Sequence, residues 1–441
     1  MNRNTINLIF FIITLNFSFS QDNKIEKFKG FFDFTYNQSK DKIFLHVDKL
    51  DYEFLYIGSL ASGVGSNDIG LDRGQLGSER LVKFVKKGNK LLLIEPNLYY
   101  RAETENKSEK KSVEQAFAKS VIFGFEIIES KEDSYLIDIT PFLMYDRHGV
   151  EKRLRDSKQG SYKVDKSKSA IEIENTKAFP ENVEFEALLT FSGEAKGNLI
   201  RSVAPDPDNV TVFQHHSFIK LPDNNYKPRK FDARSGAISI SYMDYSTPIT
   251  ESITKKYIIR HRLEKKNPEL DISEAVEPII YYLDPGTPEP VKSALLDGGK
   301  WWNQAYESIG FKDAFQVKML PEGVDPLDCR YNVIQWVHRS TRGWSYGASV
   351  VDPRTGEIIK GHVSLGSLRI RQDYMIAQAL TRDPFISEEN NNKMLELAIS
   401  RIRQLSAHEI GHTIGFAHNF AASSNNRASV MDYPHPLVDI K

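Results

Sequence analysis

The chain contains 441 residues, with 58 basic and 59 acidic side chains and a formal net charge of −1 at pH 7. This balance gives no reason to expect nucleic acid or an anionic membrane surface as a partner. Hydrophobic residues make up 40% of the chain, which is enough for packed cores, and the length predicts two to three domains. The only cysteine, Cys329, excludes an internal disulfide.

Residues 1–20 have the pattern of an export signal. Arg3 supplies a positive charge, Leu8 to Leu15 form a short apolar core, and small polar residues surround Ser20. The apolar run is too short for a comfortable membrane span, and no other stretch of the chain is long enough. We therefore predict cleavage after Ser20 and a soluble, exported protein that is periplasmic, on the cell surface or extracellular.

The next segment, residues 21–105, reads as an N-terminal β-rich domain. Ile43, Leu45 and Val47 recur at every second position, as on the buried face of a strand. Glycine, serine and aspartate are frequent at positions 61–77, which predicts a connecting loop. Residues 102–113 are polar and charged, so we place a domain boundary there.

A second β-rich domain is predicted for residues 114–265, where alternating patterns recur, for example at positions 183–187. The basic run from Lys152 to Lys168 is interpreted as a solvated loop rather than a nucleic-acid patch, because acidic residues interrupt it. The pair His215-His216 has no neighbours at metal-ligand spacing. We interpret both as surface or core histidines.

The last segment, residues 275–441, mixes strands and helices. Its predicted elements are a strand at 279–283, a helix at 288–310, a buried strand at 331–337 and a hairpin at 348–365 that turns at 352–356. Gly298-Gly299 should weaken the middle of the helix. With the β-rich segments before it, this pattern predicts an α+β protein.

The strongest functional signal is the pattern H-E-x-x-H-x-x-G-x-x-H at residues 408–418. Apolar residues at helical spacing between positions 394 and 405 predict a helix that continues into this pattern. His408 and His412 then share one face and can direct two imidazoles at one ion. An accidental match is the alternative, but the chain has only 11 histidines, and composition alone gives the pattern in on the order of one chain in tens of thousands.

The rest of the motif completes a catalytic metal site. Gly415 can adopt the left-handed conformation that ends a helix, so that the chain turns and returns His418 as a third ligand. Three protein ligands leave an open position for water, which is the arrangement of catalytic rather than structural Zn²⁺. Glu409 lies beside the ligands without occupying the metal, and is the candidate general base.

The motif is followed by Ser429-Val430-Met431-Asp432-Tyr433, and the two together resemble the metzincin clan of zinc endopeptidases. The resemblance implies a twisted mixed sheet with a long active-site helix, Zn²⁺ as cofactor and a protein or peptide as substrate. It implies that Met431 is an apolar floor beneath the histidines and that Tyr433 hydrogen-bonds the reaction intermediate. A gluzincin site, which needs a further glutamate ligand downstream, is excluded because only a short tail follows.

The resemblance also implies an antiparallel edge strand that lines the cleft and pairs with extended substrate. We assign this role to residues 361–366. Within that strand, His362 is expected to be a surface residue rather than a fourth ligand.

Nearly the whole mature chain resembles large exported bacterial proteins in which two domains of unknown function precede a toxin-like, EcxA-type zinc peptidase module. The stretches that carry this likeness are residues 41–48, 226–236 and 429–436. Such relatives continue beyond the methionine turn, whereas this chain ends at Lys441, so we expect an incomplete C-terminal subdomain. The alternative hypothesis is a truncated, non-catalytic surface or binding protein that retains the zinc motif.

Overall fold

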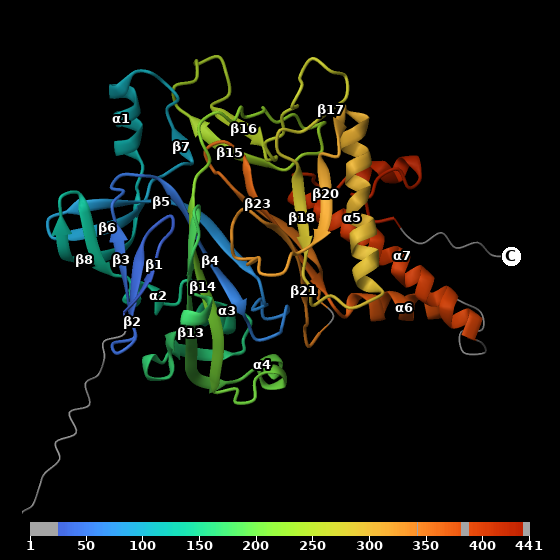
Figure 1. Cartoon of the computed structure of the whole chain (residues 1–441), viewed down its shortest axis with the longest axis horizontal. Helices are drawn as coiled ribbons and strands as arrows, with labels where there is room; N and C mark the ends of the chain where they lie inside the picture. The colour runs from blue at the N-terminus through green and yellow to red at the C-terminus, as the bar shows by residue number, and fades with distance from the viewer. Residues whose placement is uncertain (1–24, 342, 381–387, 435–441) are drawn as a thin grey trace, which may run out of the picture.

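The computed structural model describes residues 25–341, 343–380 and 388–434 (Figure 1). The predicted export signal and the residues after 434 lie outside these ranges. The described part is an α+β protein, as predicted, with an antiparallel sheet in its first half and a mixed sheet with long helices in its second. None of the described helices is long and apolar enough to cross a membrane.

The first half forms one antiparallel sheet of 13 strands, drawn from blue to green in Figure 1. Its path is β1-β2-β3-β9-β8-β6-β5-β4-β14-β13-β10, and β11 and β12 also pair with β13. The strands are β1 (Ile25–Phe28), β2 (Phe34–Asn37), β3 (Lys42–Val47), β4 (Phe54–Ser62), β5 (Leu76–Lys87), β6 (Lys90–Glu95), β8 (Ser120–Lys131), β9 (Ser134–Asp138), β10 (Gly160–Val164), β11 (Ala170–Ile171), β12 (Lys177–Ala178), β13 (Asn182–Ala195) and β14 (Asn209–Lys220).

Short helices occur between the strands of this sheet. They are α1 (Lys107–Ala116), α2 (Thr140–Leu143), α3 (Val150–Asp156), α4 (Asn198–Val203), η1 (Lys166–Lys168) and η2 (Ile173–Asn175). The strands follow the predicted alternation, since Ile43, Leu45 and Val47 of β3 are all fully buried. The predicted loop at residues 61–77 is confirmed in the main, because β4 ends at Ser62 and β5 begins at Leu76.

The sheet continues across the boundary expected at residues 102–113. Strands β8 and β9 follow this boundary in sequence, yet they lie between β3 and β6, which precede it. The polar stretch itself forms much of the exposed helix α1, whose first turn is capped by the Asn106 side chain. The limits of the predicted domains stay a prediction.

The interpretation of residues 152–168 as a solvated loop was wrong. This stretch contains the end of α3, strand β10 and η1. Leu154 and Tyr162 are buried in the core, while the charged residues between them face solvent. The charges hid the pattern because only one side of each short element is apolar.

A second sheet of five strands follows, in the order β20-β18-β21-β23-β22. Four strands are parallel, and β22 runs antiparallel at the edge. Its strands are β18 (Ile279–Leu283), β20 (Phe315–Met319), β21 (Asn332–Val337), β22 (Tyr346–Val351) and β23 (Ile358–Gly366). Two small sheets connect the halves; they contain β7 (Tyr100–Arg101), β15 (Ser239–Asp244) and β16 (Thr254–Ile258), and β17 (Ser273–Glu274) and β19 (Phe311–Lys312).

Two long helices, α5 (Val291–Ser308) and α7 (Glu388–Thr413), cover one face of the second sheet (Figure 1). The remaining elements are α6 (Arg369–Leu380) and η3 (Phe420–Asn425). Gly298 and Gly299 do not merely weaken α5. A Cβ on Gly298 would lie 2.0 Å from the carbonyl oxygen of Arg403, so this glycine lets α5 and α7 cross closely.

The assignment of the edge strand to residues 361–366 was wrong. These residues belong to β23, which is paired on both sides, and the antiparallel edge is β22. The expectation that His362 is a surface residue was also wrong, because the antiparallel sheet covers this face and leaves His362 8% exposed. His362 lines a cavity of about 130 Å³ between the two sheets and lies apart from the three motif histidines.

The two sheets are joined by buried polar contacts as well as apolar packing. Leu55 and Ile57 of β4 pack with Val350 of β22. Asp72, in the loop between β4 and β5, accepts a 2.6 Å hydrogen bond from the guanidinium of Arg339, and both side chains are buried. The two halves of the chain are therefore held together by specific contacts.

Candidate metal centre

The end of α7 and the turn after it carry the three motif histidines. His408 and His412 lie on the last turns of the helix, which ends at Thr413. Gly415 has φ +104°, and a Cβ there would lie 2.2 Å from the carbonyl oxygen of Ile259. The turn therefore requires glycine for both its conformation and its close contact, and it returns the chain so that His418 faces the helix.

The three histidines converge on one point. The Nε2 atom of His412 lies 3.2 Å from Nε2 of His408 and 3.1 Å from Nε2 of His418. Ligand atoms about 2.0–2.1 Å from a tetrahedral zinc ion lie roughly 3.3 Å apart, so the spacing fits such an ion. Among the described residues, no other group of histidine, cysteine or acidic side chains has a similar geometry.

The opposite ring nitrogens fix the orientation of two ligands. Nδ1 of His408 lies 2.8 Å from the carbonyl oxygen of Val430, and Nδ1 of His412 lies 2.8 Å from that of Phe416. A carbonyl only accepts, so each Nδ1 carries the proton and each Nε2 offers its lone pair. Burial lowers the pKa of His408 to about 4 and also lowers that of His412, which keeps both rings neutral.

Glu409 lies next to the first ligand and is 6% exposed. Burial raises the pKa of its carboxyl to about 7, and a hydrogen bond donated by the Gly347 N–H opposes this rise. A Cβ on Gly347 would lie 2.1 Å from the carbonyl oxygen of Glu409, so the glycine lets β22 cross directly over α7. Sequence reasoning missed Gly347, and a glycine inside a strand was the only available signal.

The methionine turn lies on the other side of the ligands. Met431 is buried, and its sulfur would lie 2.2 Å from a Cβ on Gly411, so it packs against the helix between the first two histidines. The hydroxyl of Tyr433 lies 2.9 Å from Nε2 of His418, while the ring remains 61% exposed. The structure thus brings together every residue that the sequence predicted for the site.

The segment just before β15 supports the turn that carries His418. Ile238 donates its N–H to the carbonyl oxygen of Gly415, and Ala417 donates to that of Gly236. These two bonds place the segment 236–238 beside the turn like a short strand. No local pattern indicates this contact, since its hydrogen bonds join residues about 180 positions apart.

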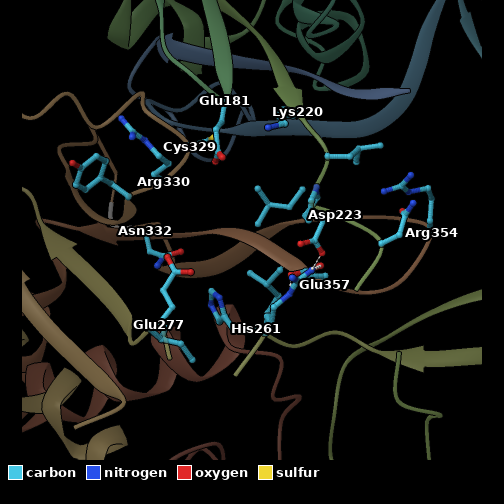
Figure 2. Close-up of a pocket in the computed structure, with 18 of the residues that line it drawn as sticks. Glu181, Lys220, Asp223, His261, Glu277, Cys329, Arg330, Asn332, Arg354 and Glu357 are labelled. Carbon is cyan, nitrogen blue, oxygen red and sulfur yellow. Dashed lines mark hydrogen bonds and ion pairs between the residues drawn. The ribbon is translucent and has the colours of Figure 1, made fainter. Parts of the chain in front are cut away.

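A larger cavity lies elsewhere in the part of the chain that the structure describes. A space of about 1100 Å³ opens between the two sheets, and Figure 2 shows side chains from both halves lining it. Ile280 and Tyr282 of β18 face it, whereas Tyr281 between them packs toward α7 and donates a hydrogen bond to the carbonyl oxygen of Thr413. The cavity therefore lies on the face of the sheet opposite the histidines.

Several of the charged side chains that line this cavity are paired with one another. Arg262 pairs with both Asp223 and Glu357, at 2.8 Å in each case. Arg354 pairs with Glu53. We assign no catalytic role to this space.

Comparison with known families supports the C-terminal assignment. Residues 390–441 match a family described as Met-zincin, and residues 74–266 match a domain of unknown function (DUF5117). No curated protein and no solved structure matches the chain. The Met-zincin match covers the histidine motif and the methionine turn, and together with the histidine geometry it supports a metzincin-like zinc peptidase. The closer likeness to EcxA-type proteins stays a prediction.

Proposed function

We propose that this protein is an exported, zinc-dependent endopeptidase. The observation that carries the proposal is the convergence of three imidazole Nε2 atoms beside a buried glutamate, under an edge strand. His408, His412 and His418 would hold the ion. A bound zinc ion supplies a Lewis acid that makes water reactive near neutral pH.

The protein groups have separate tasks in peptide hydrolysis. Glu409 takes a proton from the attacking water and later gives it to the leaving amine. The Gly347 N–H faces this carboxyl and favours its charged form, which is the form that accepts a proton. The hydroxyl of Tyr433 lies 2.9 Å from Nε2 of His418. From this position it would donate a hydrogen bond to the oxygen on which negative charge develops in the attacked peptide group.

The test begins with zinc content and ends with one substitution. We expect purified residues 21–441 to retain about one zinc ion per chain after dialysis at neutral pH. Glu409→Gln should keep this zinc but lose peptide hydrolysis by at least about a hundredfold, because general base catalysis is removed. Zinc is measured by atomic absorption and cleavage by mass spectrometry of a peptide mixture.

Either measurement can refute the proposal. Full activity in Glu409→Gln would remove this residue from the mechanism. A folded protein without zinc would favour the alternative, a surface or binding protein that only retains the motif. The export part of the proposal is checked separately by the first residue of the secreted protein, which should be Gln21.

A further inference from the structure

The outer edge of β22 forms a short track between two carboxylates. Its inner edge pairs with β23, and no other described strand pairs with its outer edge. At one end, the N–H of Gly347 faces the carboxyl of Glu409 and opposes the rise of its pKa. At the other end, the N–H of Val351 donates to Oε1 of Glu79, at 3.3 Å. Backbone groups alternate along a strand, so Ser349 presents its groups to the same outer side.

Glu79 differs from the other acidic residues that join the two sheets. It projects from β5 of the antiparallel sheet, remains exposed to solvent and has no cationic partner among the described residues. Nearby protein still removes enough water to raise the pKa of its carboxyl to about 7, opposed by the Val351 N–H. By contrast, Asp72 and Glu53 are each paired with an arginine. Glu79 is left free to bind a cation.

An unpaired edge strand beside a catalytic group is suited to hold an extended peptide by main-chain hydrogen bonds. A peptide antiparallel to β22 would run from Val351 toward Tyr346, with its N-terminal end beside Glu79. A parallel peptide would instead direct its C-terminal carboxylate toward Glu79, and like charges repel. The charge at this end of the track therefore favours the antiparallel direction.

The distance between the two carboxylates determines how many substrate residues fit between them. Gly347 and Val351 are four residues apart, which is about 13 Å of strand. Residues of paired strands match one to one, so about three to five substrate residues fit between the bond beside Glu409 and the group beside Glu79.

We propose that Glu79 binds the free N-terminal ammonium group of the substrate, so that the enzyme cuts preferentially about three to five residues from a free N-terminus. This inference rests on the proposed peptidase function and specifies its substrate. It assigns Glu79 as a specificity residue supplied by the antiparallel sheet, which lies outside the region matched to Met-zincin.

The test uses the zinc-loaded chain and matched peptides of one sequence. The free peptide should be cleaved about tenfold more efficiently, as kcat/KM, than the N-acetylated form, because an ammonium-carboxylate hydrogen bond is lost. In Glu79→Gln, which keeps an acceptor for Val351, the two peptides should differ by less than about twofold. Glu126→Gln, at an exposed site on β8, is the control and should behave as the unaltered chain.

Each other outcome has a defined meaning. Equal cleavage of both peptides by the unaltered chain overturns the inference while leaving the peptidase function intact. Rescue of the acetylated peptide by a lysine near its N-terminus would show that Glu79 reads a side chain, which also overturns it. Absence of any cleavage by the zinc-loaded chain refutes the proposed function itself.

Discussion

Two groups of histidine in this chain have opposite electrostatic surroundings. The rings of His408 and His412 are bonded to backbone carbonyls, and burial lowers the pKa of both. His215 is instead buried between two carboxylates, with Nε2 2.6 Å from Glu184 and Nδ1 3.1 Å from Glu186. Burial alone would lower the pKa of His215, but bonds to the two glutamates outweigh it and raise the pKa to about 9.

This difference separates a metal site from a structural ion cluster. A neutral imidazole that donates through Nδ1 keeps a lone pair on Nε2 for a metal ion. A charged imidazolium that donates through both nitrogens has no lone pair to offer. Glu184 is further satisfied by Asn182 and Ser217, so this cluster is complete without a ligand.

Removing one metal ligand should have the largest effect. We expect His412→Ala to weaken zinc binding by more than about a hundredfold, since loss of a ligand's outer partner alone costs about 10–100-fold. Zinc-dependent hydrolysis should fall with it, while the fold is retained. Zinc per chain and circular dichroism test this, with His338→Ala as a control at an exposed histidine. Unchanged zinc content would contradict the assignment of the triad.

The equivalent change in the second cluster should act on stability instead. His215→Ala leaves two buried carboxylates without a cation, so we expect a loss of about 3–5 kcal/mol in the free energy of unfolding. Zinc content should not change in the fraction that remains folded. Urea unfolding measures the loss, again against His338→Ala. A loss below about 1 kcal/mol would show that the cluster does not stabilise the fold.

The third prediction concerns pH. Because the pKa of His215 is raised from 6.5 to about 9, its contribution is complete below pH 6.5 and is lost as the pH rises through 9, on the order of 3 kcal/mol. In the zinc-free chain, the lowered pKa of His408 acts oppositely, and its contribution is lost as the pH falls from 6.5 toward 4. The stabilising contributions of the two clusters should therefore be lost on opposite sides of pH 6.5.

Unfolding free energies at several pH values check this sign. The difference in unfolding free energy between the unaltered chain and His215→Gln isolates the contribution of His215. The contributions of Glu79 and Glu409, whose pKa values are raised to about 7, are present in both proteins and cancel. The difference should shrink between pH 6.5 and 9. A difference that stays constant over this range would mean that His215 is not charged in the folded protein.

The errors about the edge strand and about His362 share one cause. The alternation at positions 43–47 and the spacing of the motif were read correctly because both depend on neighbours along one element. Residues 361–366 were misassigned because strand order depends on pairing with β21 and β22, which periodicity does not encode. His362 was taken as exposed because nothing local indicates that a second sheet covers β23.

The sequence by itself determined the candidate ligands, the neighbouring candidate base and the methionine turn, since helical spacing, one glycine and a short loop place them through local geometry. Only the tertiary structure decided which strand is the open edge, that Gly347 holds Glu409, and that Glu79 lies at the end of this edge. These contacts join residues up to 272 positions apart. They form only when the two sheets pack, so no pattern within one segment contains them.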